Sequence, residues 1–505
     1  METKTAAIEM RNITKRFGPV LANDKVWLNI YRGEILALLG ENGSGKTTLM
    51  NMLSGIYFPD EGEIKIDGKE VVIRSPKDAF DNGIGMIHQH FKLVDVLTVT
   101  ENIILGLKEK GKLNIRAAAQ KIAAICEKYG FDLDPMAKIY DLSVSQKQTV
   151  EIVKVLFRGA EILILDEPTA VLTPQETDRL FQVVRNMRAD GKAIVLITHK
   201  LHEVLSVSDE VAVLRKGKYI GTVKTSEATA QSLTDMMVGR AVSLNIDRPD
   251  PVDPKPRLKI EGLTCVDNLG VKRLDDVTFT AMSGEILGIA GIAGSGQREL
   301  LECITGLYPV EHGTVTFLPE GKPAQQLIGK TPNQIRKAGV AMAFVPEDRL
   351  GMGLVGSMGM GSNMMLRSWR KGKGAFVNRR DPNKLAMEVM EELEVVTPSI
   401  STPVRRLSGG NVQKVLVGRE IAMSPSVLLT AYAVRGLDIN TSYTIYNLLT
   451  QQKMKGSAVV FVGEDLDVLL ELCDRILVLC GGKISGIVDA RTATKEEIGL
   501  LMTKV

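Results

Sequence analysis

The chain repeats a long block of its own sequence. The residues from Gly33, GEILALLGENGSGKTTLMNMLSG, align with those from Gly284, GEILGIAGIAGSGQRELLECITG, at an offset of 251 residues. The same offset relates further glycines: Gly40 to Gly291, Gly45 to Gly296, Gly55 to Gly306 and Gly62 to Gly313. A period of this length is far beyond that of solenoid repeats, so it indicates a duplicated domain.

Two later pairs of residues help to locate the boundary between the copies. Ser143 and Ser408 are 265 residues apart, as are Asp209 and Asp474, so the second copy contains about 14 additional residues. Between the copies lies the segment DRPDPVDPKP, whose four prolines exclude a helix and a central strand and indicate an extended linker. We therefore predict a first domain at residues 1–246, a linker at 247–256 and a second domain at 257–505.

Composition limits the kind of protein that these copies can form. Of the 505 residues, 44% are hydrophobic and 24% are charged, as in ordinary soluble globular proteins. The net charge of +3 and the aromatic content of 5% disfavour a nucleic-acid-binding protein. The five cysteines are odd in number and lack metal-ligand spacing, so we expect reduced, buried thiols. The sequence shows no signal peptide and no apolar run of roughly 18 residues, so we expect any membrane spans to come from other chains.

Short apolar runs alternate with helical patterns in the first copy. Residues 34–40, 161–166 and 193–198 are continuous apolar segments, typical of strands buried on both faces of a parallel sheet. Each is followed by a glycine loop or a turn and then by a helical pattern. The tetrapeptide Thr173-Pro174-Gln175-Glu176 carries the signals of a helix start. Together these patterns predict an α/β fold.

The segment GENGSGKT, residues 40–47, is a P-loop at a strand-to-helix junction. Its glycines allow backbone N–H groups to approach phosphate, and the following helix adds a partial positive charge at its N-terminus. Lys46 supplies a full positive charge for the β- and γ-phosphates, and Thr47 supplies a hydroxyl ligand for Mg²⁺. The loop therefore predicts a site for a nucleoside triphosphate with Mg²⁺.

The segment ILILDEP, residues 162–168, supplies the acidic groups of this site. Asp166 ends an apolar strand, where its carboxylate can hold Mg²⁺ directly or through water. Glu167 follows at the carboxyl edge of the sheet, where α/β folds bind their ligands. It is the natural general base for a water molecule that attacks the γ-phosphate.

The order of these motifs, with an LSGG-like segment before DEP and a strand ending near His199, resembles the nucleotide-binding domain of ABC ATPases. The resemblance covers nearly the whole chain, twice, and implies two tandem P-loop NTPase domains that bind ATP and Mg²⁺. It implies that Gln89 senses the metal and contacts a membrane partner, that His199 lies at the γ-phosphate and that Phe17 stacks on adenine. The ATP contacts that it implies in the first copy are Phe17, Gly40, Glu41, Asn42, Gly43, Ser44, Gly45, Lys46, Thr47 and Thr48. The implied catalytic residues are Glu167, His199 and Gln89, and the implied metal ligands are Thr47, Gln89 and Asp166.

The second copy lacks the groups that carry this chemistry. Gln297 and Arg298 stand where the first copy has Lys46 and Thr47. The other replacements are Glu347 for Gln89, Ala431 for Asp166, Tyr432 for Glu167 and Glu464 for His199. A general base alone contributes about 10²–10⁴ in rate, so we predict that the second copy does not hydrolyse ATP.

The signature motifs show the opposite pattern. The second copy presents Ser408, Gly409 and Gly410 at a predicted helix start, where a hydroxyl and backbone N–H groups can grip a γ-phosphate. The first copy has Val144 and Ser145 in place of both glycines. ABC domains pair head to tail and share their sites, so the resemblance implies a pseudo-dimer with one complete site. That site combines the loops of the first copy with the signature of the second, and Asp438 is a further candidate.

Tandem domains with one degenerate site resemble the ATP-binding subunits of bacterial sugar and nucleoside importers. The segments LTDMMVGR (233–240) and VPEDR (345–349) add to the match, and HQHFKLVDVLTVTEN from His88 favours the nucleoside branch. The resemblance implies integral-membrane permease partners, an extracytoplasmic solute-binding protein, no nucleic acid, and a peripheral location at the cytoplasmic face of the plasma membrane. The alternatives are a soluble tandem-ABC protein such as a ribosome-binding translation factor, the ATPase of an exporter and a DNA-repair ABC ATPase. The short proline-rich linker and the single degenerate site disfavour the first alternative, and the lack of a heptad run disfavours the last.

Overall fold

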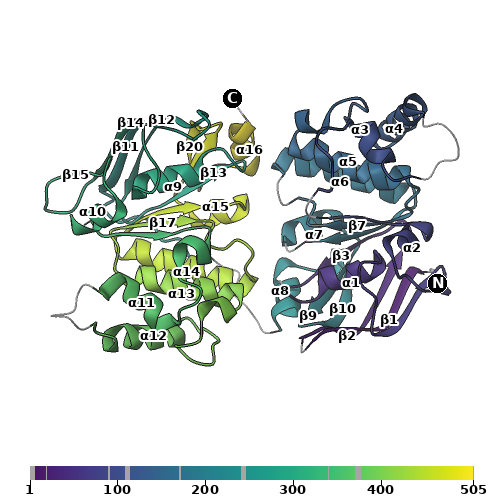
Figure 1. The fold of residues 1–505 in the computed structure, drawn as a ribbon, viewed down its shortest axis with the longest axis horizontal. Coiled ribbons are helices and arrows are strands. Elements are labelled where there is room, and N and C mark those ends of the chain that lie inside the picture. Colours follow the sequence, from purple (N-terminus) through teal and green to yellow (C-terminus); the bar gives the residue numbers. More distant parts are fainter. Residues whose placement is uncertain are drawn as a thin grey trace. The chain divides into compact units, whose positions relative to one another are not determined.

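The chain forms two compact units, Met1–Ser243 and Leu244–Val505, which are described separately (Figure 1). The computed structural model describes residues 6–18, 20–41, 43–88, 91–107, 114–169, 172–198, 200–239, 246–338, 340–369 and 377–503. Each unit contains one six-stranded and one four-stranded sheet together with helices, so the prediction of two tandem α/β domains is confirmed. Within the described ranges, no helix has both the length and the apolar character needed to cross a bilayer.

The strands of unit 1 form a mixed, mostly parallel sheet and a smaller antiparallel one. The strands are β1 (Ala6–Phe17), β2 (Val20–Tyr31), β3 (Ile35–Leu39), β4 (Glu61–Ile66), β5 (Lys69–Val71), β6 (Ile84–Ile87), β7 (Ile162–Asp166), β8 (Ala193–Ile197), β9 (Glu210–Arg215) and β10 (Lys218–Lys224). The larger sheet has the order β10-β9-β3-β8-β7-β6, and the smaller one has the order β2-β1-β4-β5. Every residue of β3, β7 and β8 is buried, which confirms the three strands predicted from continuous apolar runs. Because β3, β8 and β7 run parallel, the loops that follow them lie at one edge of the sheet.

Helices cover this sheet and form a separate group in unit 1. They are α1 (Lys46–Leu53), α2 (Pro76–Asp81), α3 (Val99–Ile104), α4 (Ile115–Tyr129), α5 (Val144–Phe157), α6 (Pro174–Ala189), α7 (Leu201–Val207) and α8 (Ala230–Val238). Helices α3, α4 and α5 pack on one another around a small apolar core that includes Ile103, Ile122 and Val150. Helix α6 begins as predicted, with a reciprocal capping box between Thr173 and Glu176.

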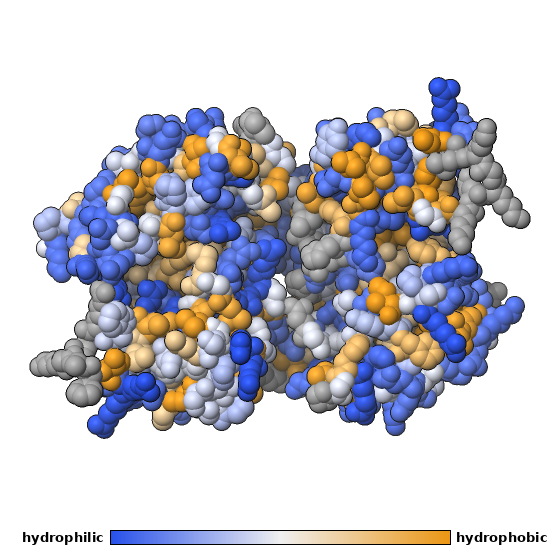
Figure 2. All heavy atoms as spheres, viewed as in Figure 1, coloured by the Kyte–Doolittle hydropathy of each residue, from blue (hydrophilic) through white to orange (hydrophobic). Residues whose placement is uncertain are grey.

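Unit 2 repeats this arrangement. Its strands are β11 (Pro256–Val266), β12 (Lys272–Met282), β13 (Ile286–Gly291), β14 (His312–Phe317), β15 (Gln325–Gln326), β16 (Met342–Val345), β17 (Val427–Ala431), β18 (Ala458–Val462), β19 (Arg475–Cys480) and β20 (Lys483–Asp489). Its helices are α9 (Gln297–Thr305), α10 (Pro332–Lys337), α11 (Met360–Ser368), α12 (Arg380–Glu392), α13 (Gly409–Ile421), α14 (Ile439–Met454), α15 (Leu466–Leu472) and α16 (Lys495–Thr503). The sheets have the orders β16-β17-β18-β13-β19-β20 and β12-β11-β14-β15, which match those of unit 1 strand for strand. On the visible face of both units, apolar residues are interspersed among polar and charged ones (Figure 2).

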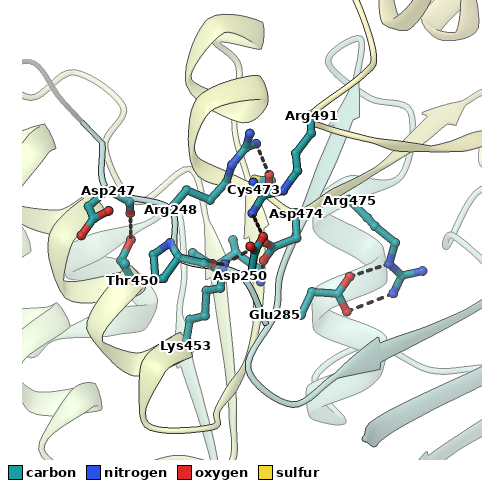
Figure 3. Close-up of polar contacts among 12 residues, drawn as sticks. Asp247, Arg248, Asp250, Glu285, Thr450, Lys453, Cys473, Asp474, Arg475 and Arg491 are labelled. Carbon is teal, nitrogen blue, oxygen red and sulfur yellow. Dashed lines mark hydrogen bonds and ion pairs between the residues drawn. The ribbon is translucent and has the colours of Figure 1, made fainter. Parts of the chain in front are cut away.

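The segment predicted as a linker, residues 247–256, is packed on unit 2 (Figure 3). Nη1 of Arg248 donates to the carbonyl oxygens of Leu470, at 2.6 Å, and Cys473, at 2.7 Å, and so satisfies carbonyls at the end of α15. Nζ of Lys453 donates to the carbonyl oxygen of Pro249, at 2.5 Å, and to Asp474, at 2.7 Å. The Arg248 side chain and the Lys453 ammonium therefore fix this segment on unit 2, a contact that the sequence did not predict.

The ion pair beneath this segment is much more buried than its counterpart in unit 1. The side chains of Lys453 and Asp474 are 2% and 8% exposed. The corresponding pair of unit 1, Arg188 and Asp209, is 43% and 25% exposed at a similar distance of 2.5 Å. In both units the aspartate also accepts a hydrogen bond from the first backbone N–H of the P-loop strand, Ile286 or Ile35.

The two aspartates predict unequal effects on stability. Replacing Asp474 with Ala leaves the Lys453 charge buried without its partner and is expected to cost about 3–5 kcal/mol of unfolding free energy. Asp209→Ala removes the same backbone hydrogen bond but leaves a solvated arginine, so it should cost roughly 2 kcal/mol less. Hydrogen exchange of the full-length chain, read on β13 and β3 respectively, measures both losses. Equal losses of protection would contradict the role of burial.

Candidate functional site

The P-loop of unit 1 has the backbone of a phosphate cradle. Gly43 and Gly45 adopt positive φ angles of 79° and 96°, and Gly45 caps α1 without a side-chain hydrogen bond. A Cβ on Gly45 would lie 2.3 Å from the carbonyl oxygen of Ala22, so only glycine fits there. The Ser44 hydroxyl is buried and has no hydrogen-bond partner among the described residues. A phosphate oxygen seated on the loop would accept its proton, so these residues fit a nucleotide.

Lys46 is buried within this loop, with 7% of its surface exposed. Its Nζ donates to the carbonyl oxygens of Gly40, at 2.7 Å, and Glu41, at 3.1 Å. Burial lowers the pKa of the Lys46 ammonium, while the neighbouring charges of Glu167 and Asp166 raise it. Lys46, Asp166 and Glu167 therefore interact electrostatically at the carboxyl edge of β3 and β7, as the sequence analysis predicts for the phosphate cation and the two carboxylates.

Asp166 ends β7 as predicted, and the residue after it has an unusual backbone. Burial, and secondarily the charge of Glu167, raises the pKa of Asp166 to about 6, while a hydrogen bond from Thr47 opposes the shift. Glu167 has a φ of 47°, and its N–H donates to the carbonyl oxygen of Ile197 at 2.9 Å. A non-glycine residue rarely adopts this conformation, so the surrounding strands hold Glu167 in a strained turn of a kind that is frequent at functional sites.

Thr47 and Asp166 fit a magnesium site. A protein commonly holds Mg²⁺ through one or two carboxylates, with substrate phosphates and water filling the other positions. Asp166 is the buried carboxylate here, and the Thr47 hydroxyl lies within hydrogen-bond reach of it. Thr48 follows, partly buried in the first turn of α1.

The predicted adenine platform contains a second aromatic ring. Phe17, at the end of β1, is 42% exposed and packs edge-to-face against Tyr57 with ring centroids 5.1 Å apart. Lys15 lies 5.6 Å from the centroid of the Phe17 ring and forms an ion pair with Asp60 at 2.7 Å. An aromatic pair of this kind is worth about 0.5–1.5 kcal/mol beyond its buried area, so Tyr57 fixes the Phe17 ring. Sequence reasoning missed Tyr57, because it lies 40 residues from Phe17 and belongs to no motif.

Three predicted site residues, Asn42, Gln89 and His199, lie outside the described residues. The remaining predicted residues of unit 1 are present in the loop, in α1, at the end of β7 and at the end of β1. Ser408, Gly409 and Gly410 belong to unit 2.

In unit 2 the P-loop keeps its shape without its charge. Gly294 and Gly296 have φ angles of 89° and 101°, close to those of Gly43 and Gly45. Gln297 is 2% exposed, and its Nε2 donates to the carbonyl oxygen of Ile292 at 3.0 Å. The amide thus makes one of the backbone contacts that an ammonium makes in unit 1, but it brings no positive charge to a phosphate.

The other replaced positions of unit 2 converge on one arginine. Nη1 of Arg435 lies 2.5 Å from Oε1 of Glu347, and its Nε lies 3.2 Å from Oε1 of Glu464. The same guanidinium lies 5.8 Å from the ring centroid of Tyr432, whose pKa burial raises to about 12. In unit 2 the residues that replace the general base, the switch histidine and the loop glutamine, Tyr432, Glu464 and Glu347, thus share Arg435 through a cation–π contact and two ion pairs.

The signature of unit 2 is built for close backbone approach. Ser408 caps α13, and its Oγ accepts a hydrogen bond of 2.8 Å from Nδ2 of Asn411, so its own proton is available to an acceptor. A Cβ on Gly409 would lie 3.2 Å from Nη1 of Arg349, and one on Gly410 would lie 3.3 Å from Oδ2 of Asp438. A side chain at position 410 would therefore crowd Asp438, whereas one at position 409 would press only on the flexible end of Arg349.

The signature turn of unit 1 is held by hydrogen bonds between its own residues. Ser143 caps α5 and forms a reciprocal capping box with Gln146, whose N–H donates at 3.2 Å and whose side chain accepts at 3.0 Å. Val144 is exposed at this turn. The two signatures therefore share a helix start but differ in the groups that they offer to a ligand.

Two parts of the chain, residues 23–170 and 274–430, match the ABC transporter family. The chain belongs to this family. Its two units are ABC ATPase domains, domain 1 and domain 2, as the sequence motifs predicted. The match covers both P-loops and both strands that follow the signatures, and it establishes ATP as the nucleotide that the family binds.

Full-length relatives share this organisation. The nucleoside import ATP-binding protein NupA of Lactococcus lactis is 44% identical over 500 residues, covering 98% of this chain and 97% of that protein. The guanosine import ATP-binding protein NupO of Bacillus subtilis is 43% identical with the same coverage. The ribose import ATP-binding protein RbsA 1 of Rubrobacter xylanophilus is 38% identical and covers 98% of each chain. These relatives confirm the resemblance to nucleoside and sugar importers and give no support to the soluble tandem-ABC alternative.

The raised pKa of Asp166 predicts a measurable titration. Below about pH 6 the carboxyl holds a proton, which Mg²⁺ must displace, so metal binding should weaken as the pH falls through 6. Difference infrared spectroscopy of the nucleotide-free chain should show a protonated carboxyl with a midpoint near pH 6. The signal should be absent from Asp166→Asn. A midpoint near about 4, the ordinary value for aspartate, would contradict the effect of burial.

Proposed function

We propose that this chain is the ATP-hydrolysing subunit of a nucleoside importer, bound to a separate permease at the cytoplasmic face of the plasma membrane. Two observations support the proposal. Relatives with 44% and 43% identity over nearly the whole chain are import proteins for nucleosides and for guanosine. The two domains also divide the parts of an ATP site between them. A solute-binding protein outside the membrane would select the nucleoside.

We further propose that the chain has one hydrolytic site, shared by both domains. Domain 1 offers a charged loop and two carboxylates, but its signature turn is closed by a capping box. Domain 2 offers Ser408 and two glycines at its signature, but Gln297 replaces the P-loop lysine, Arg298 of the loop is paired with Glu302, and Glu347 and Glu464 are paired with Arg435. Each domain lacks what the other has, which is the arrangement expected if they pair head to tail.

In this site the residues have separate tasks. Lys46 and the loop N–H groups would hold the β- and γ-phosphates, and Phe17 would stack on adenine. Thr47 and Asp166 would hold Mg²⁺, which supplies charge stabilisation to the phosphates. Glu167 would take a proton from the attacking water. His199 and Gln89 would contact the γ-phosphate and the metal, and Gln89 would also face the permease.

The shared site predicts an asymmetry between the two signature serines. Ser408→Arg should reduce ATP turnover by about 10²-fold or more, because it removes a hydroxyl donor and fills the turn that receives the γ-phosphate. Ser143→Arg is the matched control, since it removes the same helix cap from the degenerate signature, and it should leave turnover within about threefold. Steady-state ATPase assays of the full-length chain measure both variants. Full activity of Ser408→Arg would refute the shared site.

The nucleoside assignment is tested by transport. A strain that lacks this chain should lose uptake of labelled nucleosides and keep uptake of labelled ribose. The wild-type chain should restore uptake, whereas Glu167→Gln should not, because it keeps the fold and removes the general base. Tagged Glu167→Gln should still purify with a hydrophobic permease pair from detergent-solubilised cells. Loss of ribose uptake instead would move the chain to the sugar branch, and purification with ribosomal proteins but no permease would overturn the importer assignment.

A further inference from the structure

Glu203, on α7, links the turns that follow two neighbouring strands of domain 1. Its Oε2 accepts a hydrogen bond of 2.7 Å from the hydroxyl of Thr169 and one of 3.2 Å from the hydroxyl of Thr198. Thr169 lies three residues beyond the end of β7, Thr198 directly follows β8, and these strands pair in parallel. One carboxylate thus joins the two turns at the edge of the sheet where the predicted general base, Glu167, lies.

The bridge is shielded from water. Thr169 and Thr198 are each 2% exposed, and the side chain of Glu203 is 11% exposed. Nζ of Lys200 lies 3.1 Å from the other carboxylate oxygen, Oε1, and donates to the carbonyl oxygen of Thr169, also at 3.1 Å. Hydrogen bonds to a charged group are strong in such a place, and removing one partner leaves the other unsatisfied. The carboxylate therefore fixes both threonine side chains and has the counter-charge that its burial requires.

Three consecutive residues after β7 are held in this way in domain 1. The Glu167 N–H donates to the carbonyl oxygen of Ile197 at 2.9 Å, and Nε2 of Gln148 donates to the carbonyl oxygen of Pro168 at 2.5 Å. Thr169 is held through both its hydroxyl and its carbonyl oxygen, as described above. A catalytic group has to stay within about 0.5 Å of its productive position, and hydrogen bonds from the surrounding residues supply that precision. The turn therefore has the support that a general base needs.

The residues of domain 2 cannot form this bridge. With the offset of 265 residues that aligns β8 with β18, the residues at its three positions are Val434, Gly463 and Val468. The two valines pack against the apolar core of the domain instead. Gln413, the buried counterpart of Gln148, has an amide with no hydrogen-bond partner among the described residues. The support is thus present in the domain that keeps the general base and lost from the domain that does not.

The turn itself folds without this support. In domain 2 Tyr432 has a φ of 50°, close to the 47° of Glu167, and its N–H donates to the carbonyl oxygen of Val462 at 3.1 Å. The same backbone conformation therefore forms where no bridge is possible. What the bridge adds in domain 1 is a fixed separation of the turns after β7 and β8, which matters for chemistry at that edge rather than for folding.

We infer that Glu203 is a positioning residue for ATP hydrolysis by domain 1: by tying Thr169 to Thr198, it holds the turn that carries Glu167 in place for proton abstraction from the attacking water. Its carboxylate acts through the turn and takes no part in the proton transfer itself. The inference rests on the proposed function, in which Glu167 is the general base. Loss of the carboxylate should therefore slow the chemical step and leave the contacts of the P-loop with the phosphates unchanged.

The test is steady-state ATP turnover by the full-length chain, with kcat and KM for ATP measured separately. Glu203→Ala and Thr169→Val should each lower kcat by about 10- to 100-fold and leave KM within about threefold, because they impair the general base and not the P-loop. The double variant should lose little more than either single variant, since both changes break one bridge. Glu203→Gln, which keeps an oxygen acceptor for the threonines, should retain kcat within about fivefold of the wild type.

The matched control is Glu161→Ala. Glu161 and Lys192 directly precede β7 and β8 and form an ion pair of 3.0 Å, so they link the same two strands at their opposite ends. The side chain of Lys192 is 9% exposed, so this variant also leaves a buried charge without its carboxylate and should lower the unfolding temperature. It should nevertheless keep kcat within about threefold of the wild type, because it lies far from the reacting groups. Equal losses of kcat in Glu161→Ala and Glu203→Ala would overturn the inference.

The Glu167→Gln background separates a role through the general base from any other role. Single-turnover hydrolysis of labelled ATP measures the residual rate of this variant. Adding Glu203→Ala should lower that rate by no more than about twofold, because the group that the bridge positions is already gone. A further loss of about tenfold would mean that Glu203 acts on another part of the site, and would overturn the inference.

The same variants distinguish this inference from the proposed function. If Glu167→Gln abolishes turnover while Glu203→Ala and Thr169→Val keep the wild-type kcat, the general base stands and the role of Glu203 is refuted. If Glu167→Gln itself turns over ATP at the wild-type rate, the assignment of the general base fails, and the positioning role fails with it.

Discussion

The buried ammonium of Lys46 is the interaction on which the rest of the site depends. Two backbone carbonyl oxygens accept its hydrogen bonds and hold it in place, but bonds to neutral acceptors do not cancel a charge in a poorly solvated loop. Asp166 and Glu167 act on the same space, and Asp166 itself is buried enough to keep a proton to about pH 6. Such a collection of charges suits a polyanion with its metal ion. Domain 2 places the neutral amide of Gln297 at the same point, so its loop keeps the backbone shape but lacks the buried ammonium.

The backbone conformation of the two domains has diverged less than the side chains of their catalytic positions. Glu167 and Tyr432 share an unusual positive φ, 47° and 50°, and both donate their N–H to the neighbouring strand. The turn therefore persists in domain 2 although no general base remains there. The strained backbone at the end of this strand is thus present in both domains, whereas the catalytic side chains around it are present only in domain 1.

Much of this fold follows from local sequence. The continuous apolar runs became β3, β7 and β8, the Thr173 segment became a capped helix, and the P-loop glycines have the φ angles that their motif requires. Each of these features depends on residues close together in the chain. The Tyr57 ring against Phe17 and the bridges from Arg435 to Glu347, 88 residues away, depend on tertiary packing and leave no periodic signal. Arg349 was visible in a motif, but its place beside Gly409 came only from the structure.

The anchoring of residues 247–256 changes how the chain can be divided. Arg248 satisfies carbonyls at the end of α15, and the backbone of Pro249 accepts from the buried Lys453. A second domain that began at residue 257, where the proline-rich stretch ends, would lack these partners and would expose an ion pair built to be covered. Genetic separation of the halves therefore has to leave the proline-rich stretch with domain 2. Residues 247–256, which connect the two copies of the duplicated domain, are therefore a structural part of domain 2.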